Sequence, residues 1–594
     1  MTADTTPATP PPPSRYAAKP WLGLLSPAQR APIAPPPSVL HAFRAAVARA
    51  PERTALAYFD GRLDYAEADA LSDSLAGHLA ARGIRRGDRV AVMLQNTPHF
   101  VLAVLAAWKA GAVVVPLNPM YKSGEVGHVL RDSGAAALVC EAGAWSAYLG
   151  ETVRGTGVRV ALTAHDTDFQ TRNDPRVFPE PGSAGFRGAE PPPGGAGTAD
   201  GAPGSCAAEP YAPGPDGPGP ADLLTVARQG HPVPPDPELT AADTALISYT
   251  SGTSGTPKGA MNPHGALTHN ALRQVTGHPL PEGAGYFALA PLFHITGMVC
   301  ELAACFANAG TLVLAHRFDA GAVLDAFLEH RPAYTVGPAT AFMALAAHPA
   351  ATPDHFASFQ VVSSGGAPLP PALVERLRAA YGFYLRNGYG LTECTAPCAS
   401  VPFHREAPVD PASGTLSVGV PGADTLVRIL DESGAEVPFG ETGEIAVRGP
   451  QVVPGYWGLP ADTAKAFPDG ELRTGDVGFM DPEGWLYVVD RKKDMINASG
   501  FKVWPREVED VLYTHPAVRE AAVVGIPDPY RGESVKAYVS LRPGTAADPA
   551  ELSAYCAERL AAYKYPRRVE ILPVLPKTTS GKILRRELRT RDHG

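Results

Sequence analysis

Several features that would mark particular protein classes are scarce or missing in this chain. Its seven cysteines form no C-x-x-C pair and no zinc pattern with histidine, so neither a disulfide framework nor a zinc site is predicted. The 51 basic residues do not outnumber the 60 acidic ones, and no basic run occurs, which argues against a nucleic-acid partner. The first 13 residues lack the apolar core of a signal peptide. These absences predict a cytoplasmic protein with reduced thiols.

Long uninterrupted apolar runs are also missing. The run Val101–Leu117 is short and is broken by Lys109, and the longer run Phe287–Ala315 contains His294 and Glu301. Polar groups at bilayer depth are costly, so we expect both runs to form protein core rather than transmembrane segments. Weak association with a membrane surface is left open.

The chain is long enough for two or more domains, since single cores rarely grow beyond about 250–300 residues. Its first half alternates between apolar strands and amphipathic helices, which indicates a parallel sheet with crossover helices. The expected strands are 89–94, 113–117 and 135–140, and the expected helices are 97–112 and 123–133. After Lys493 a compact α+β module is expected, with helices at 505–514 and 548–562 and strands at 518–525 and 535–541.

Two segments have compositions that disfavour a packed core. Residues 181–220 contain 21 glycines or prolines in 40 positions and almost no aliphatic side chains. Such a segment cannot bury enough surface to offset its loss of conformational entropy. We therefore expect a disordered insertion at 163–235 and a disordered N-terminal arm at 1–35.

The densest chemical signal is the string from Tyr249 to Gly259, which follows a short apolar strand at 245–247. Glycines let backbone N–H groups turn toward an anion, hydroxyls add donors, and a lysine adds a point charge. The pattern differs from the common P-loop because Pro257 precedes the lysine and Gly259 follows it. It predicts a polyphosphate site made of Thr250, Ser251, Gly252, Thr253, Ser254, Gly255, Thr256 and Lys258.

This string resembles the phosphate loop of the adenylate-forming enzymes, which include acyl-CoA synthetases, luciferases and peptide-synthetase adenylation domains. Further segments resemble that family in the same order along the chain, from about Pro36 to Arg589. They are Asn387–Glu393, Thr474–Asp476, Asp490–Asp494, Ser499–Lys502 and Pro576–Lys582.

The resemblance implies an α/β fold with a large N-terminal adenylate-forming domain, 36–492, of parallel sheets and crossover helices. A small mobile C-terminal α+β lid, 493–594, would follow it. The implied reaction joins a carboxylic acid to AMP and transfers the acyl group to coenzyme A, with ATP as substrate and Mg²⁺ as metal. The segments Lys19–Leu22 and Asn118–Lys122 resemble fatty-acid CoA ligases, which favours a medium- or long-chain fatty acid. An aryl-acid CoA ligase, a ligase that loads a carrier-protein thiol, and a non-catalytic adenylate-binding protein remain alternatives.

Chemistry and resemblance together assign the nucleotide residues. An ionised Glu393 suits Mg²⁺, which keeps few carboxylate ligands, and the resemblance adds Thr250 at the metal. Lys582 is expected to bridge the substrate carboxylate and the α-phosphate as a point charge. Asp476 can accept both ribose hydroxyls and Arg491 can complement the ribose or phosphate. The expected adenine side comprises Gly365, Gly366, Ala367, Asn387, Gly388, Tyr389, Gly390 and Thr392.

The resemblance also assigns the remaining functions. His294 and Gly297 match the segment that lines the acyl pocket. Lys493 matches the hinge about which the C-terminal domain rotates between the two half-reactions. Gly500 lies where the pantetheine of coenzyme A would pass, because glycine permits close approach of a ligand.

Overall fold

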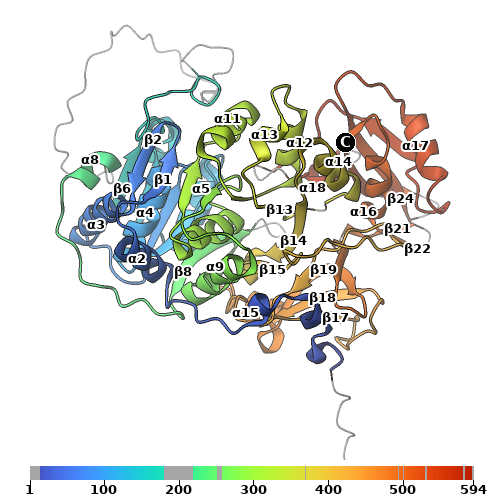
Figure 1. Ribbon diagram of the computed structural model, residues 1–594, viewed down its shortest axis with the longest axis horizontal. Coiled ribbons are helices and arrows are strands. Elements are labelled where there is room, and N and C mark those ends of the chain that lie inside the picture. The colour runs from blue at the N-terminus through green and yellow to red at the C-terminus, as the bar shows by residue number, and fades with distance from the viewer. Residues whose placement is uncertain are drawn as a thin grey trace, which may run out of the picture.

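The structure is a computed structural model that describes residues 14–179, 219–250, 257–367, 369–491, 494–498, 501–528, 532–578 and 582–591. In these residues the chain builds two large sheets, a smaller antiparallel sheet, and a separate C-terminal sheet (Figure 1). The expected α/β class with a large parallel-sheet domain and a small C-terminal domain is confirmed.

The first large sheet has the order β7-β6-β5-β3-β4-β8-β9, and its neighbours are parallel except for the antiparallel hairpin of the last two strands. The expected alternation is present as β3, α4, β4, α5 and β5. The bounds are β3 (Arg89–Met93), α4 (Pro98–Lys109), β4 (Val113–Pro116), α5 (Ser123–Ser133), β5 (Ala137–Glu141), β6 (Val160–Ala164), β7 (Pro220–Asp222), β8 (Thr244–Thr250) and β9 (Lys258–Pro263).

The second large sheet has the order β16-β15-β14-β13-β12-β10-β11-β1-β2, with parallel strands at its centre and antiparallel strands at both edges. Its strands are β1 (Thr54–Tyr58), β2 (Gly61–Asp64), β10 (Gly285–Phe287), β11 (Thr311–Leu314), β12 (Tyr334–Gly337), β13 (Val361–Gly365), β14 (Leu385–Leu391), β15 (Ala396–Ser400) and β16 (Val420–Pro421).

Helices fill the space between the two large sheets. Every residue of α4 is buried, and its side chains share one core with both sheets and with α9 (His264–Gly277). Lys109 at its end is 2% exposed and pairs with Asp69 and Asp73 of α3 (Tyr65–Ala81). Both apolar runs are therefore core, as expected. Among the described residues no helix has the length and hydrophobicity needed to cross a bilayer.

The smaller sheet is β17 (Leu426–Leu430), β18 (Gly443–Arg448), β19 (Leu472–Met480) and β20 (Leu486–Arg491). The C-terminal sheet has the order β22-β21-β24-β23 with β25 against β24. Its elements are β21 (Ile496–Ala498), β22 (Phe501–Val503), α16 (Pro505–Tyr513), β23 (Val518–Asp528), β24 (Gly532–Leu541), α17 (Pro549–Ala557), β25 (Arg568–Ile571) and α18 (Arg585–Thr590). The helix expected to reach residue 562 ends at Ala557.

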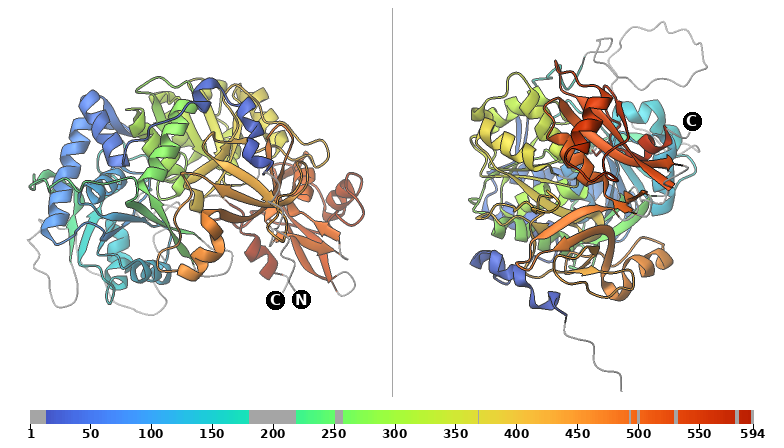
Figure 2. Two further views of the ribbon diagram at one scale, coloured as in Figure 1. Left: turned by 90° about the horizontal axis from the view of Figure 1, so that it is seen from below. Right: turned by 90° about the vertical axis from the view of Figure 1, so that its right-hand side faces the viewer.

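The expected disorder of the N-terminal arm 1–35 is wrong for its described part. Tyr16 and Trp21 are fully buried in the core of the smaller sheet, and the Tyr16 hydroxyl donates to the Val437 carbonyl at 3.0 Å. Figures 1 and 2 show this segment lying against β17 and β18. The proline-rich composition was misleading because two aromatic side chains suffice to anchor the segment.

The expected insertion 163–235 is also too wide. On the N-terminal side of residues 180–218, Asp174 and Val177 are buried. On the C-terminal side, β7 extends the first sheet and α8 (Leu223–Arg228) buries Leu223 and Val226. Residues 180–218 lie outside the described residues.

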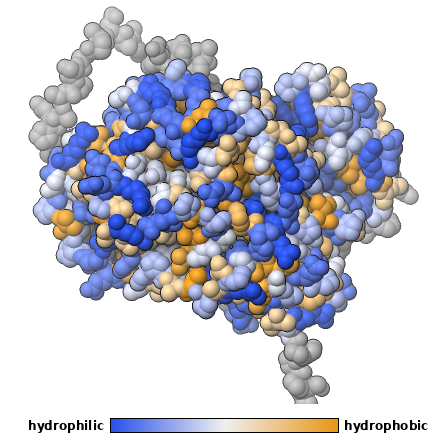
Figure 3. Space-filling model, in the orientation of Figure 1, coloured by the Kyte–Doolittle hydropathy of each residue, from blue (hydrophilic) through white to orange (hydrophobic). Residues whose placement is uncertain are grey.

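On the face of the molecule drawn in Figure 3 hydrophilic residues predominate, with small hydrophobic groups between them.

Candidate active site

A pocket opens beside the carboxyl ends of β12, β13 and β14, the edge at which parallel sheets usually bind ligands. The C-terminal residues contribute Lys582, so the wall is built from both parts of the chain. Gly365, Gly388 and Gly390 line the pocket from the ends of β13 and β14. The other lining residues include Gln274, His278, His294, Ile295, Thr296, Cys300, Tyr334, Val336, Ser363, Ser364, Gly366, Arg386, Asn387, Tyr389 and Thr392.

The predicted phosphate loop is closed by the β8–β9 hairpin. Thr250 ends β8, Lys258 begins β9, and the two are register partners. The Thr250 hydroxyl donates to the Lys258 carbonyl at 3.5 Å, and the Lys258 ammonium pairs with Asp462 of α15 (Pro460–Ala466). Residues 251–256 lie outside the described residues, so Ser251, Gly252, Thr253, Ser254, Gly255 and Thr256 stay predictions. The pairing of Thr250 with Lys258 holds the two ends of the loop next to each other.

The predicted metal carboxylate is already oriented by a tyrosine. Glu393 follows β14 in a short helix (Thr392–Cys394), and its Oε1 accepts a hydrogen bond from the Tyr456 hydroxyl at 2.9 Å. Burial, and then the charge of Glu393, raises the pKa of Tyr456, so the hydroxyl remains a donor. In the described ranges no group of three His, Cys, Asp or Glu side chains could hold a metal alone. One carboxylate and one hydroxyl fit Mg²⁺, which takes its other ligands from phosphates and water.

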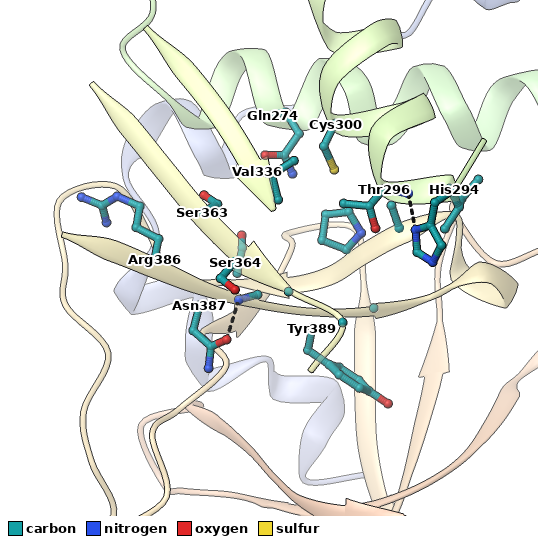
Figure 4. Close-up of a pocket in the computed structure, with 18 of the residues that line it drawn as sticks. Gln274, His294, Thr296, Cys300, Val336, Ser363, Ser364, Arg386, Asn387 and Tyr389 are labelled. Carbon is teal, nitrogen blue, oxygen red and sulfur yellow. Dashed lines mark hydrogen bonds between the residues drawn. The ribbon is translucent and has the colours of Figure 1, made fainter. Parts of the chain in front are cut away.

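The predicted adenine and ribose residues come together across a long separation. The Tyr389 hydroxyl donates to Asp476 Oδ2 at 2.8 Å, and both side chains are buried. Two backbone groups hold the side-chain amide of Asn387. Its Nδ2 donates to the Ser417 carbonyl at 3.1 Å, and its Oδ1 accepts from Gly388 N–H at 3.1 Å, the second bond being drawn in Figure 4. Carbonyl oxygens have a second lone pair, so Oδ1 can still accept from a ligand.

Lys582 reaches the pocket beside Gly366. A Cβ added to Gly366 would stand 3.2 Å from Lys582 Cε and 3.5 Å from Nζ, and its φ of +78° also favours glycine. His294 lies close enough that burial, and then the positive charge of Lys582, lowers the pKa of its imidazole to about 3. Lys582 therefore places a cation at the edge of the pocket, and His294 stays neutral.

Some predicted residues are not placed in the pocket. Gly297 begins a π-helix (Gly297–Ala303) and packs against Pro291, whose carbonyl oxygen would lie 2.4 Å from an added Cβ. Thr296 and Cys300 line the pocket instead. Ala367 is described but does not line it.

The structure does not describe the side chains of three further predicted residues: one for the ribose or phosphate, one for the hinge and one for coenzyme A. Arg491 is the register partner of Asp476, but its side chain is not described. Lys493 and Gly500 lie outside the described residues. Their assigned roles stay predictions.

Sequence reasoning missed the polar residues at the other end of the pocket. Arg386 and His294 lie at opposite sides of the labelled group in Figure 4, with Ser363, Val336 and Cys300 between them. Gln274 and His278, from α9 and its C-cap, also line the pocket. The only sequence signal was the position of Arg386 directly before Asn387.

Comparison with known proteins gives concordant results. The AMP-binding enzyme family matches residues 43–457, and the AMP-binding enzyme C-terminal domain matches residues 507–582. A feruloyl-CoA synthase from Amycolatopsis sp is 38% identical over 543 residues, covering 91% of this chain and 96% of that protein. A long-chain-fatty-acid–CoA ligase from Bacillus subtilis is 34% identical over 547 residues, with 91% and 92% covered. A solved structure of O-succinylbenzoate coenzyme A synthetase from Bacillus subtilis, in complex with ATP and magnesium ion, is 28% identical with a TM-score of 0.72, covering 93% of this chain and 100% of that one.

Proposed function

The chain belongs to the AMP-binding enzyme family, and from this membership and the site we propose that it is an ATP-dependent acid–CoA ligase. A carboxylate oxygen attacks the α-phosphate of ATP and pyrophosphate leaves. The thiol of coenzyme A then attacks the acyl carbonyl, the thiol proton is released, and AMP leaves. The observation that carries the proposal is Lys582, which the C-terminal residues bring to Gly366 at the ends of the parallel strands.

In the formation of acyl-AMP, some site residues supply charge and others hold the nucleotide in position. Lys582 supplies a point charge where the carboxylate approaches the α-phosphate, and the neutral His294 adds no competing charge. Lys258 and Thr250 hold the polyphosphate, while Asp476 and Tyr389 bind the ribose and adenine. Glu393 and Thr250 would hold Mg²⁺, which supplies charge neutralisation on the phosphates.

The acid is proposed to be aromatic and to carry a ring hydroxyl. Ser363 lies two residues before Gly365 along β13 and is the register partner of both Arg386 and Val336. At a strand rise of about 3.3 Å per residue, these three residues lie about 7 Å further into the pocket than Gly365. One level further in, Tyr334 packs against the His278 ring with centroids 5.8 Å apart. An acid bound in the pocket would therefore reach polar side chains a short distance beyond Gly365.

These polar groups have capacity for a ligand. His278 donates from Nδ1 to the Gln274 carbonyl at 2.9 Å, and burial lowers its pKa to about 4, so Nε2 is an acceptor. The Arg386 guanidinium lies 5.2 Å from the ring centroid of Tyr384 and 4.8 Å from that of Phe403, and it donates to two backbone carbonyls. A ring hydroxyl can donate to His278 and accept from Arg386 or Gln274. A hydrocarbon tail would offer no hydrogen-bond partner to His278 Nε2 or to the Gln274 side chain, and each buried polar group left without a partner costs about 1–3 kcal/mol.

Pyrophosphate release over a panel of acids tests both levels of the proposal. The panel contains a hydroxycinnamic acid, the same acid without its hydroxyl, and fatty acids of medium and long chain. We expect kcat/KM for the hydroxylated acid to exceed that of its deoxy analogue by at least about tenfold, or about 1.4 kcal/mol. Gln274→Leu should reduce that ratio. A preference for a long-chain fatty acid would contradict the aromatic acid and support the fatty-acid specificity that the sequence favoured. If no acid of the panel released pyrophosphate in the presence of CoA, the ligase proposal would be refuted.

A further inference from the structure

The segment of residues 453–463, here called the edge segment, lies along the strand that begins with Lys258. Met261 N–H donates to the Gly455 carbonyl at 3.0 Å and Trp457 N–H donates to the Gly259 carbonyl at 2.8 Å, with an antiparallel bridge between Ala260 and Tyr456. The edge segment thus extends the sheet beyond β9. Its position brings Tyr456 between the predicted phosphate and metal residues.

Tyr456 contacts both of those residues. Its hydroxyl donates to Glu393 Oε1 at 2.9 Å, and Lys258 Nζ lies 5.4 Å from the centroid of its ring. Glu393 and Lys258 are 135 positions apart in sequence, yet one side chain touches the carboxylate and the ammonium. No motif recognised in the sequence includes Tyr456.

The surroundings of Tyr456 fix its position. Its N–H donates to Thr463 Oγ1 at 3.0 Å and its ring packs on Phe467 with centroids 5.5 Å apart. Gly455 has φ +154°, and an added Cβ there would meet Thr463 Cγ2 at 2.4 Å. Val453 N–H also donates to the Glu393 carbonyl at 3.0 Å. The edge segment therefore holds both the backbone and the carboxylate of Glu393.

We infer that Tyr456 is a positioning residue for the Mg²⁺–nucleotide half of the site. Its hydroxyl donates to Glu393 Oε1 and thereby fixes the rotamer of the carboxylate. The other carboxylate oxygen, Oε2, is then left to bind the metal. Hydrogen bonds to ligating carboxylates contribute about 10–100-fold in metal affinity or activity when tested by mutation. This inference rests on the proposed function, because that function assigns Glu393 to Mg²⁺ and Lys258 to phosphate.

The test is ATP binding by Tyr456→Phe, which removes the hydroxyl and keeps the ring. Isothermal titration calorimetry with the full chain compares ATP affinity in excess Mg²⁺ and in EDTA. We expect binding about 10–100-fold weaker in Mg²⁺ and nearly unchanged in EDTA. Equal affinity to wild type in Mg²⁺, or an equal loss in both buffers, would overturn the inference.

A double-mutant cycle with Glu393→Gln separates positioning from general structural damage. If the hydroxyl acts through the Glu393 carboxylate, removing it from the Glu393→Gln protein should change Mg²⁺-dependent ATP binding by less than about twofold. Additive losses would contradict the inference. The matched control is Tyr487→Phe, which deletes a hydroxyl that donates to Asp481 at 3.3 Å outside the pocket and should bind ATP as wild type does. Wild-type protein that binds ATP without Mg²⁺ dependence would instead refute the metal assignment of the proposed function.

Discussion

Charged residues at the nucleotide end already have protein partners. Lys258 pairs with Asp462, and their side chains are 26% and 38% exposed. A polyphosphate that takes over Lys258 must share or break this ion pair. Exposed pairs of this kind contribute only about 0.2–1 kcal/mol, so the competition is mild.

Asp462→Asn removes that competition without changing side-chain size. We expect the KM for ATP to fall by up to about fivefold, in line with a pair worth about 0.2–1 kcal/mol. Initial-rate measurements with ATP as the varied substrate provide the value. Asp236→Asn, which removes a remote exposed partner of Arg44, should leave the KM unchanged. A higher KM in Asp462→Asn would mean that the aspartate orients Lys258 rather than competing for it.

A second residue-scale effect concerns His264, which is fully buried edge-on against Trp108 with no hydrogen bond to either ring nitrogen. Burial lowers the pKa of His264 from 6.5 to about 3. The folded state therefore binds fewer protons than the unfolded state between these values, and stability falls as pH drops below about 6.5.

His264→Phe should flatten this acid-side loss. The phenyl ring keeps the contact with Trp108 but cannot take up a proton in the unfolded state. Between pH 6.5 and 5.0 the wild-type free energy of unfolding should decline more steeply, by up to about 1.4 kcal/mol per pH unit for this group. Urea unfolding at several pH values measures the difference. Parallel pH profiles for the two proteins would contradict the assignment.

At the scale of the elements, the N-terminal segment contributes more to the packed core than its proline-rich composition indicates. Trp21 is fully buried, and a Cβ on Gly484 would stand 2.5 Å from its backbone nitrogen. The segment thus closes one side of the β17–β20 core.

Trp21→Ala should therefore destabilise the large domain by about 3–5 kcal/mol, the range for truncating a buried large aromatic side chain. Thermal or denaturant unfolding measures the loss, and the exposed Arg30→Ala provides a control with little effect. A change below about 1 kcal/mol would mean that the segment packs without stabilising the domain.

At the scale of the whole molecule, substitutions of Lys582 and of the predicted hinge residue Lys493 should affect opposite half-reactions. Lys582→Ala removes the cation beside Gly366 and should impair pyrophosphate formation while largely sparing thioester formation from supplied acyl-AMP. Lys493→Pro fixes φ near −65° at the predicted hinge, so we expect the reverse: thioester formation should fall at least about tenfold. Separate assays of the two half-reactions on each variant test the pair. Equal losses in both half-reactions for either variant would contradict its assigned role.

The sequence by itself determined the α/β class and the core location of both apolar runs. It also predicted the site residues Thr250, Lys258, Glu393, Asn387, Asp476 and Lys582. Apolar periodicity and short strings carry this information because they depend on neighbours along the chain. Only the tertiary structure decided that Tyr389 meets Asp476, that Tyr456 meets Glu393, and that Gln274, His278 and Arg386 form a polar pocket end. Those contacts depend on strand order and register between distant segments, which no local pattern specifies.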